Sequence, residues 1–518
     1  MSQMHSCTAT AAALLAGPEL PPIAFDNSFA RELEGLYVPW QPAPVPDPRL
    51  LWFNDALAAE LGLDAAALCG ARGAALFGGN AVPAGAAPLA QAYAGHQFGG
   101  FSPQLGDGRA LLLGEVIDRH GQRRDVAFKG SGRTPFARGG DGKAALGPVL
   151  REALLGEAMH VLGVPTTRAL AVVATGEPVR RERALPGAVL TRVAASHLRV
   201  GSLEFFAARG QIQELTRLAE YALARHDPEL AGRADRWLAW LHAVTGRQAR
   251  LVAQWMNLGF IHGVMNTDNM TLSGETIDYG PCAFLEAYDP ATVFSSIDHG
   301  GRYGFGNQPR IARWNLARLA EALLPLLVQE GPEAGTDRAT AAAIERAQAV
   351  LEGFDAMFEA AHRAGQRAKL GLSGAQAQDG ELADDWLDLL LQQQVDFTLA
   401  WRRLADAALG NTGPLRALFA APVALEAWLA RWHTRCAAEP TTAAARAAAM
   451  RRASPWLIPR NHRVEEALAA AVDRDDLAPF LRLLSALQQP FDERPTDADL
   501  AEPAAPELTA HYRTFCGT

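Results

Sequence analysis

The 518-residue sequence contains few cysteines, and none of them has the spacing of a metal ligand. No CxxC pair occurs, and the five cysteines are scattered at Cys7, Cys69, Cys282, Cys436 and Cys516. Disulfide frameworks and zinc sites both need recurring, closely spaced cysteines, so the pattern indicates neither. We therefore expect a protein of the reducing cytoplasm.

Long apolar runs and an excess of basic residues are also missing. No segment supplies the roughly 20 uninterrupted apolar residues of a membrane-spanning helix. The start of the chain, MSQMHSCTATAAALLAG, has a short apolar run but no positively charged region before it. The formal net charge of −9 disfavours a general nucleic-acid-binding protein. We expect partners that are neither membranes nor nucleic acids.

The composition and length are those of a globular protein. Hydrophobic residues make up 49% of the 518 positions, which is enough to bury a large core. A chain of this length predicts two to four domains. Residues 21–63, rich in proline and aromatic residues, predict an extended arm that ends in a short helix.

Strands and helices then follow in a recognisable order. RALLLGEVI (109–117) and RRDVAFKG (123–130) predict two strands joined by a tight turn. PVLREALLGEAMHVLG (148–163) has apolar residues at helical spacing, with Pro near its start and Gly at its end. Two further strands are expected at 168–176 and 186–196, before a helical region from 203 to 252.

The second half of the chain is predicted to be helical. ARWNLARLAEALLPLL (312–327) predicts a helix, and the remainder of the chain is rich in alanine. Residues 364–381, rich in Gly, Gln and Ala, predict a linker or loop.

A lysine and a glutamate are placed as in protein kinases. Lys129 ends the second predicted strand, and Glu152 lies 23 residues later on the following helix. Kinases fix a phosphate-binding lysine with such a pair. Because long chains contain many Lys and Glu at this spacing, an unrelated structural pair is the alternative.

Glycines and arginines flank this region. Gly106 and Gly108 precede the first strand, where missing side chains let backbone N–H groups approach phosphates; a plain tight turn is the alternative. Arg192 and Arg199 follow the last strand and could clamp a phosphate, although surface arginines are common. GGDGK is not a Walker A motif, since Ala144 replaces the required Ser or Thr.

The stretch GFIHGVMNTDNMTLSGETIDYGP (259–281) carries the strongest signal. Laid on the kinase catalytic loop, it places His262 at the kinase His, Asn269 at the metal-binding Asn and Asp278 at the metal-binding Asp. The position of the catalytic Asp is occupied by Val264. Asp268 is then the nearby carboxylate that could accept a proton, with a structural loop cap as the alternative. Asp and Asn oxygens suit Mg²⁺ shared with nucleotide phosphates.

Several long strings identify a resemblance. They are AYAGHQFGGFSPQLGDGRA, FKGSGRTPFARGGDGKAALGPVLRE, HGVMNTDNM, TIDYGP, GRYGFGNQP, WNLARLAEAL and SPWLIPRNHRVEEAL. They resemble the selenoprotein O family, and the similarity covers nearly the whole chain.

The resemblance implies a fold and its boundaries. The family has an α+β, protein-kinase-like bilobal fold of the kind found in pseudokinases. Carried over, the chain would comprise an N-terminal extension at 1–90, a kinase-like N-lobe at 91–202, a kinase-like C-lobe at 203–370 and a helical C-terminal region at 371–518.

The resemblance also implies an activity. The family acts as a protein adenylyltransferase, which moves AMP from ATP to Ser, Thr or Tyr hydroxyls of proteins and binds ATP in an inverted orientation. Uridylyl transfer from UTP with Mn²⁺ is attributed to bacterial members. The implied protein targets belong to redox homeostasis.

Residue roles carry over by matching motifs. Lys129, Arg192 and Arg199 would hold phosphates, and Glu152 would position Lys129. Asp268 would be the proton acceptor, and Asn269 and Asp278 would bind Mg²⁺ or Mn²⁺. The residues that would line the nucleotide are Gly106, Gly108, Arg109, Asp141 and Gly142, together with Asp278.

Redox control is a further implication of the resemblance. The family often carries a selenocysteine or cysteine near its C-terminus, where this chain has Cys516 in YRTFCGT. In some members this residue pairs with a cysteine after the DYGP segment, where this chain has Cys282. A disulfide between Cys282 and Cys516 is therefore a hypothesis.

Two other functions stay open at the level of sequence. One is a small-molecule or protein phosphotransferase of kinase-like fold, which would need a catalytic Asp at the position of Val264. The other is an inert nucleotide-binding scaffold, which would not require both Asn269 and Asp278.

Overall fold

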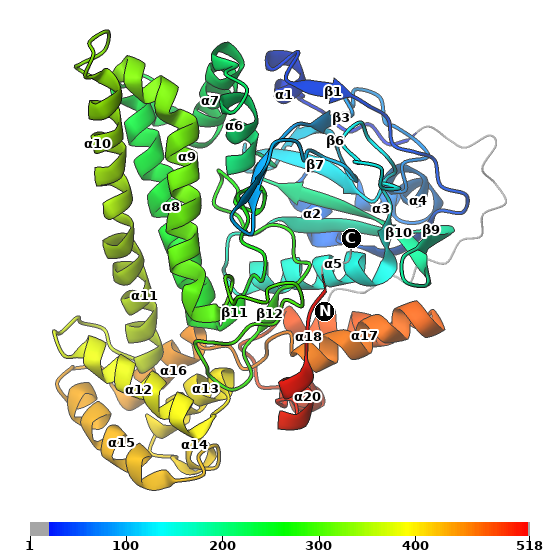
Figure 1. Cartoon of the computed structure of the whole chain (residues 1–518). Helices are drawn as coiled ribbons and strands as arrows, with labels where there is room; N and C mark the ends of the chain where they lie inside the picture. Colours follow the sequence, from blue (N-terminus) through cyan, green and yellow to red (C-terminus); the bar gives the residue numbers. More distant parts are fainter. Residues whose placement is uncertain (1–19, 516–518) are drawn as a thin grey trace.

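The computed structural model describes residues 20–515, in which one antiparallel sheet lies beside a large body of helices (Figure 1). The sheet has eight strands in the order β1-β3-β6-β7-β10-β9-β2, with β8 paired to β10. Its strands are β1 (Tyr37–Pro39), β2 (Arg49–Phe53), β3 (Leu89–Gln91), β6 (Ala110–Ile117), β7 (Arg123–Lys129), β8 (Ala144–Ala145), β9 (Arg168–Arg180) and β10 (Ala184–Ala194).

The four long strands expected from the sequence are confirmed. β6, β7, β9 and β10 are rich in Val, Leu and Ala, and most of their side chains are buried. Such runs are typical of strands covered on both faces. In the register of the sheet, Lys129 at the end of β7 lies between Ala110 of β6 and Leu190 of β10.

The predicted N-terminal arm contributes more than an extended segment. It contains the helices α1 (Ser28–Glu32) and α2 (Asp55–Glu60), and its strands β1 and β2 join the two edges of the sheet; α3 (Ala65–Leu68) and α4 (Ala71–Phe77) follow it. Asn54 begins α2 by accepting the backbone N–H of Leu57 at 3.1 Å, which satisfies a free amide of the helix start.

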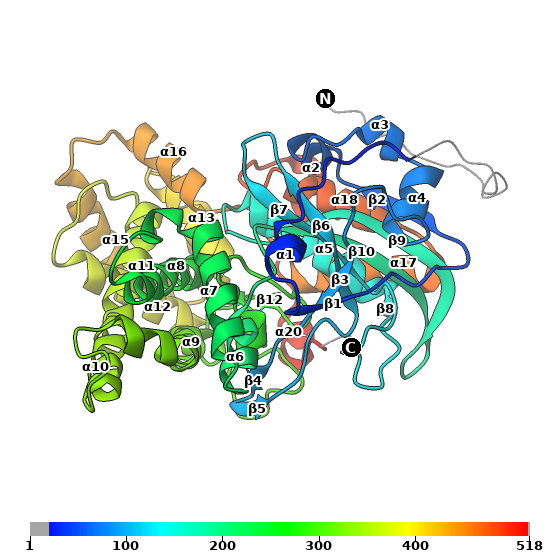
Figure 2. The same ribbon diagram turned by 90° about the horizontal axis from the view of Figure 1, so that it is seen from above.

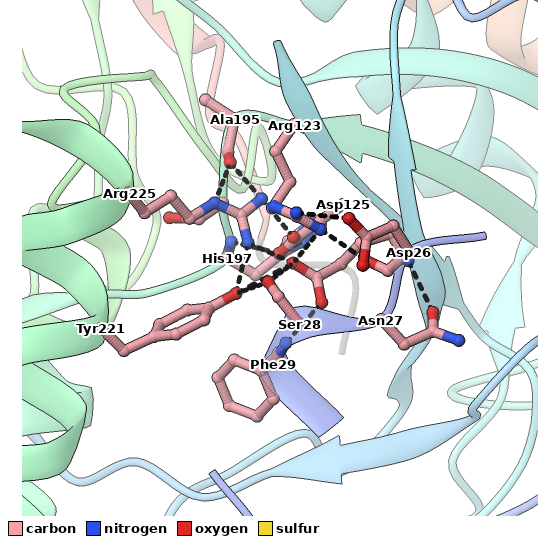
Figure 3. Close-up of polar contacts among 12 residues, drawn as sticks. Asp26, Asn27, Ser28, Phe29, Arg123, Asp125, Ala195, His197, Tyr221 and Arg225 are labelled. Carbon is pink, nitrogen blue, oxygen red and sulfur yellow. Dashed lines mark hydrogen bonds and ion pairs between the residues drawn. The ribbon is translucent and has the colours of Figure 1, made fainter. Parts of the chain in front are cut away.

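A network of buried polar side chains, here called the arm anchor, ties the arm to the sheet (Figure 3). Glu115 of β6 accepts the backbone N–H of Phe29 at 2.6 Å and the Arg225 guanidinium at 2.7 Å. Asp125 of β7 accepts the other side of the same guanidinium at 2.6 Å. The arm anchor comprises Ser28, Phe29, Glu115, Arg123, Asp125, Tyr221 and Arg225.

One long helix, α5 (Leu146–Val161), crosses a face of the sheet and is buried over most of its length. It packs against β9 and β10 on one side and against α17 (Asn461–Arg474) and α18 (Ala478–Leu487) on the other. Figure 1 shows α17 and α18 beneath α5. The C-terminal part of the chain therefore returns to support the helix that carries Glu152.

The helical body lies beside the sheet and begins after β10. Its helices are α6 (Val200–Ala207), α7 (Ile212–His226), α8 (Arg236–Leu258), α9 (Gln308–Glu330), α10 (Ala339–Glu352) and α11 (Phe354–Leu370), with a 3-10 turn η1 (Pro228–Leu230). Between α8 and α9 run the short strands β11 (Phe260–Ile261) and β12 (Ala283–Phe284) and the 3-10 turns η2 (Thr267–Asn269) and η3 (Phe305–Asn307). A separate hairpin is formed by β4 (Gly95–Gln97) and β5 (Gly100–Ser102).

The linker expected at 364–381 is wrong over much of its length. Helix α11 continues to Leu370, and α12 begins at Asp379. Gln366, Lys369 and Leu370 are buried, so tertiary packing holds the helix together despite the glycine and glutamine content. The helix ends where Gly371 takes the left-handed conformation, with φ +71°.

The helical C-terminal region is confirmed. Its core is built around indoles, with Trp386 and Trp401 fully buried and in edge-to-face contact at 5.8 Å between ring centroids. The helices are α12 (Asp379–Gln393), α13 (Phe397–Ala407), α14 (Gly413–Arg416), α15 (Pro422–Ala437), α16 (Ala443–Ala453), α17, α18, α19 (Ala498–Ala501) and α20 (Pro506–His511), with the 3-10 turn η4 (Pro495–Asp497). None of the helices within residues 20–515 has the length and apolar character needed to span a bilayer.

Candidate active site

The structure brings five of the predicted site residues into one buried charged cluster. The Lys129 ammonium donates to Glu152 at 2.5 Å and to Asp278 at 2.7 Å. Arg192 reaches the same two carboxylates, at 2.9 Å and 2.8 Å. Together with Arg199, whose guanidinium lies 3.8 Å from Asp278, these residues are here called the cation cluster.

Each member of the cation cluster comes from a different element. Lys129 ends β7 and Arg192 lies on the neighbouring β10, opposite Ala127, so both side chains lie on the face of the sheet that α5 covers. Glu152 comes from α5 beneath it. Asp278 stands in the left-handed region with φ +64°, which is strained for a residue with a Cβ. Strain of this kind persists where the surroundings hold it, and it concentrates at functional sites.

The cluster carries more positive than negative charge. Burial acts to raise the pKa of Asp278, but Lys129, Arg192 and Arg199 outweigh it and hold that pKa well below its usual range. Burial also opposes ionisation of Glu152, and the Lys129 and Arg192 charges again lower its pKa. Within the cluster three cations therefore face two ionised carboxylates, and Asp107 and Asp268 are the other carboxyl groups that act on Arg199.

Arg199 is the cation with room for another partner. It precedes α6, its guanidinium stacks 4.4 Å from the centre of the Tyr93 ring, and it is 3% exposed. Within the described part of the chain its Nε atom is buried without a hydrogen-bond acceptor. A buried donor of this kind costs free energy unless an acceptor arrives, which makes the site suitable for an anion such as phosphate.

Asp268 lies next to this region on η2 and is also incompletely bonded. Its Oδ2 atom accepts Gln97 Nε2 at 3.3 Å, whereas Oδ1 is buried without a partner among the described residues. Burial raises the pKa of Asp268 to about 6, although Arg199 acts in the opposite direction. A carboxylate with one free oxygen can accept a proton from an approaching hydroxyl.

The other residues of the kinase-like loop are buried and apolar or neutral. Val264, at the position of the kinase Asp, is 6% exposed. His262 donates its Nε2–H to the Ile277 carbonyl at 2.9 Å, and burial lowers its pKa. Asn269 donates its amide N–H to the Val264 carbonyl at 2.9 Å, which leaves its side-chain oxygen as the remaining ligand atom.

The donor set at Asn269 and Asp278 suits a hard cation. The first offers an amide oxygen and the second an ionised carboxylate, which are ligand types that Mg²⁺ and Mn²⁺ prefer. Within residues 20–515 there is no group of three or more His, Cys, Asp or Glu side chains placed to hold a metal ion. A cation here would therefore share its coordination with substrate oxygens rather than with a protein cage.

The predicted nucleotide-lining glycines lie in tight backbone contacts. At Gly106, with φ +78°, an added Cβ would come within 2.4 Å of the Phe136 ring. At Gly142, with φ +69°, it would meet the Gly132 backbone at 2.2 Å. Only glycine fits at these two positions, which explains their placement but leaves a phosphate-binding role as a prediction. Gly108 and Arg109 continue from this turn into β6.

Asp141 lies farther out, beside a cavity of about 610 Å³. Its carboxylate accepts the Arg181 guanidinium at 2.8 Å and is 40% exposed. Trp40 of the arm and Arg133 line the same cavity. The loop of Asp141 and Gly142 thus borders an open space, while the cation cluster is buried.

The predicted redox pair lies partly outside the described residues. Cys282 carries a free, buried thiol that donates to the Tyr279 carbonyl at 3.3 Å, and burial raises its pKa to about 12. Cys516 is not among residues 20–515. The disulfide therefore stays a prediction.

The hairpin β4–β5 was not anticipated from the sequence. Gly95 packs so closely on the Asp268 carboxylate that an added Cβ would come within 2.6 Å of Oδ1. Gln97 supplies a side-chain hydrogen bond to Asp268 Oδ2. The signal was available in GHQFGG, because closely spaced glycines around a polar pair mark a tight turn that approaches another backbone.

Comparison with known proteins identifies close relatives. Residues 20–488 match the family model described as protein adenylyltransferase SelO. A protein from Cereibacter sphaeroides named protein nucleotidyltransferase YdiU is 62% identical over 495 residues, covering 95% of this chain and 99% of the relative. Proteins of the same name are 60% identical over 482 residues in Chromobacterium violaceum (93% and 99% covered) and 54% identical over 502 residues in Rhizobium rhizogenes (96% and 98% covered).

Proposed function

Because the chain belongs to the family of the protein adenylyltransferase SelO, we propose that it transfers AMP from ATP to Ser, Thr and Tyr hydroxyls of other proteins. The family makes the chain a protein nucleotidyltransferase with ATP as its substrate. The observation that carries the finer proposal is the excess of buried positive charge beside a buried carboxylate that has one free oxygen.

The cation cluster supports a site for the triphosphate. Lys129, Arg192 and Arg199 would hold phosphate oxygens, and Glu152 would keep the Lys129 ammonium in place. ATP would lie in the inverted orientation, with its α-phosphorus facing the acceptor. The backbone of Gly106 and Gly108 would line the nucleotide, together with Arg109, Asp141 and Gly142.

The chemical step requires a proton acceptor and a stabilised leaving group. The acceptor hydroxyl oxygen forms a bond to the α-phosphorus while the bond from that phosphorus to the bridging oxygen of the β-phosphate breaks. The Asp268 carboxylate takes the hydroxyl proton, and the arginines and Lys129 stabilise the pyrophosphate that leaves. A divalent cation bound to Asn269 and Asp278 would neutralise phosphate charge. UTP with Mn²⁺ is proposed as a second substrate pair.

The arrangement of elements supports a kinase-like bilobal fold. A twisted antiparallel sheet carries Lys129, one helix presents Glu152 to it, and the loop between β11 and β12 carries Asn269 and Asp278. We retain the boundaries 1–90, 91–202, 203–370 and 371–518 as proposed units. Proteins of redox homeostasis are retained as proposed targets.

Val264 argues against phosphoryl transfer by the usual kinase route. Its side chain is buried and apolar, so no carboxylate at that position can take a hydroxyl proton. In adenylyl transfer from an inverted nucleotide, the proton acceptor would be Asp268 instead of a residue at position 264.

A labelling experiment tests the reaction. The purified protein is incubated with a bacterial lysate, Mg²⁺ and ATP labelled on either the α- or the γ-phosphate. We expect the α-label alone to enter protein. Transfer of the γ-label alone would identify a phosphotransferase, and transfer of neither would contradict the proposed function.

The proton acceptor is tested separately by Asp268→Asn. The amide keeps the shape of the side chain but cannot take a proton, so transfer should fall by about a hundredfold or more while ATP binding is retained. Asp278→Asn is the contrasting variant and should weaken metal-dependent ATP binding itself. Loss of ATP binding in Asp268→Asn would contradict the assigned role.

A further inference from the structure

The β4–β5 hairpin projects beside the candidate proton acceptor. Figure 2 shows it at the edge of the molecule, next to α6. His96 donates its backbone N–H to Thr267 Oγ1 at 2.7 Å, and its ring contacts the Glu204 carboxylate at 2.5 Å. Thr267 donates its hydroxyl to the same carboxylate. Since Thr267 immediately precedes Asp268, these bonds fix the hairpin rigidly to the turn that holds the acceptor.

The outer face of this hairpin exposes aromatic side chains. Phe98 is 39% exposed and Phe101 is 42% exposed, although most large apolar side chains of the described residues are buried. Their rings lie against other aromatic side chains, with Phe98 5.0 Å from Tyr303 and the Phe101 ring 4.9 Å from His96. His96 in turn contacts the half-buried Trp314 of α9 at 5.3 Å. Arg302 lies over both the buried Tyr303 ring and the Trp314 ring and so links the two groups, which are here together called the aromatic surface.

Phe98 is held in an unfavourable backbone conformation. Its φ of +52° lies in the left-handed region, where a bulky side chain costs about 1–2 kcal/mol relative to glycine. Gly99 and Gly100 follow directly, so the turn already contains residues that would adopt such angles without strain. An exposed, strained phenylalanine at this position contributes little to folding, which is typical of a residue retained for binding.

The aromatic surface is bordered by arginines that lack acidic partners. Arg302 lies over the Trp314 ring at 4.7 Å and against Gly99, and its Nε atom has no acceptor within residues 20–515. Arg209 is exposed, covers the Phe205 ring at 3.5 Å and donates to the Pro103 carbonyl at 2.9 Å. Neither arginine forms an ion pair with a described carboxylate. This local positive charge contrasts with the formal net charge of −9 of the whole chain.

We propose that the β4–β5 hairpin, with Trp314, Arg302 and Arg209, is the docking surface for the acceptor protein, and that it binds an extended segment carrying acidic side chains beside its hydroxyl residue. The apolar part of the segment covers Phe98 and Phe101, and its carboxylates pair with the two arginines. The rigid connection to η2 then presents the hydroxyl to Asp268. This inference rests on the proposed adenylyl transfer and specifies its substrate class.

Charge complementarity decides between occupants. A nucleic acid would also be attracted by arginines and aromatic rings, but it would need a wide basic face, and the surface offers two isolated arginines. A basic or neutral segment would leave both arginines unpaired. An acidic segment pairs with both positive charges at once.

The first experiment measures transfer to short peptides from ATP labelled on the α-phosphate. Three peptides carry one serine in an otherwise identical apolar sequence, flanked by Asp, Asn or Lys. We expect kcat/KM to be highest for the Asp peptide and lowest for the Lys peptide, by about fivefold or more per step. Equal transfer to all three would overturn the docking proposal. No transfer to any peptide or lysate protein would instead contradict the proposed function.

Charge reversal provides the sharper test. Arg302→Glu and, separately, the more exposed Arg209→Glu should reduce kcat/KM for the Asp peptide and increase it for the Lys peptide. Arg452→Glu, an exposed change on α16, is the matched control and should alter neither. A preference that stays with Asp in both the Arg302 and the Arg209 variant would overturn the assignment. ATP binding measured by calorimetry should be unchanged in all three.

The aromatic surface is tested without charge. Phe101→Ser should raise the KM for the Asp peptide by about tenfold, because the peptide then loses one apolar contact. Val423→Ser, at a site 82% exposed on α15, is the control. Phe98→Gly should lower transfer while leaving the melting temperature unchanged or higher, since glycine relieves the strained φ. Full transfer in both Phe variants would overturn the proposal.

Discussion

The arm anchor and the cation cluster are two buried charge networks attached to the same sheet, and they differ in how completely their atoms are paired. In the arm anchor both oxygens of Glu115 and both oxygens of Asp125 accept hydrogen bonds (Figure 3). Two arginines, Arg123 and Arg225, face these two carboxylates. In the cation cluster, positive charges outnumber carboxylates and the Nε of Arg199 has no acceptor among the described residues.

The difference separates a structural network from one prepared for a ligand. Buried polar groups in a finished structure are normally satisfied, because an unpaired one costs the full penalty of its desolvation. The arm anchor meets this rule and holds the arm, α7 and two strands together. The cation cluster departs from it where an anionic substrate would supply the missing acceptors. Buried charge alone therefore does not identify a ligand-binding site. Buried charged groups that lack partner atoms within the protein do.

The largest expected effect on stability comes from removing a charge of the arm anchor. Arg225→Ala leaves Glu115 and Asp125 buried without their shared cation, so the free energy of unfolding should fall by about 3–5 kcal/mol. Arg236→Ala removes a surface arginine that pairs with Glu220 and should cost less than about 1 kcal/mol. Urea unfolding of the two variants measures the difference. Equal losses would show that the arm anchor is not a structural support.

A change in the cation cluster should have the opposite effect, with little loss of stability and a large loss of ATP binding. Arg199→Met removes a surplus cation but keeps an apolar side chain over Tyr93, so the free energy of unfolding should change little. The KM for ATP should rise by about tenfold to a hundredfold, because a charge-assisted hydrogen bond to phosphate is lost. Calorimetric ATP titration and urea unfolding together test the pair of expectations. A large loss of stability without an effect on the KM for ATP would show that Arg199 supports the fold and does not bind phosphate.

Local sequence patterns predicted the parts of the fold that local patterns determine. The strand pair around RHGQ and the helix that begins near Pro148 have periodicities that their neighbours reinforce. The sequence could also suggest that Lys129 and Glu152 approach, since a strand end and the next helix are adjacent in space. It could not show Arg192 on both carboxylates, which depends on the register between β7 and β10.

Long-range packing accounts for what was missed. The continuation of α11 through residues 364–370 depends on burial of Gln366 and Lys369 by other helices, which overrides a glycine-rich composition. The proximity of Gln97 to Asp268 joins residues 171 positions apart. Neither the free oxygen of Asp268 nor the unpaired Nε of Arg199 can be read from a motif, because each is a property of the assembled surroundings.

The smallest expected effect concerns His197, the imidazole that joins the two networks. Its Nε2 accepts Arg192 Nε at 3.2 Å, so its Nδ1 carries the hydrogen that it donates to Asp125 at 3.0 Å. Burial lowers its pKa, and the surrounding charges are Asp125 on one side and Arg192 and Arg199 on the other. The ring is therefore neutral in the folded chain and links the two networks without adding charge to either.

This protonation state gives stability a pH dependence that a variant can remove. Below about pH 6.5, the usual imidazole pKa, the unfolded chain binds a proton that the folded chain does not, so stability present above that pH is lost as the pH falls. The loss attributable to His197 is at most about 1.4 kcal/mol per pH unit. His197→Asn keeps a donor for Asp125 but cannot titrate, so its unfolding free energy should fall less steeply below pH 6.5 than that of the wild type. Val423→Asn, a change at an exposed position of α15, should retain the wild-type slope, and identical slopes in all three proteins would mean that the link between the networks is not a neutral imidazole.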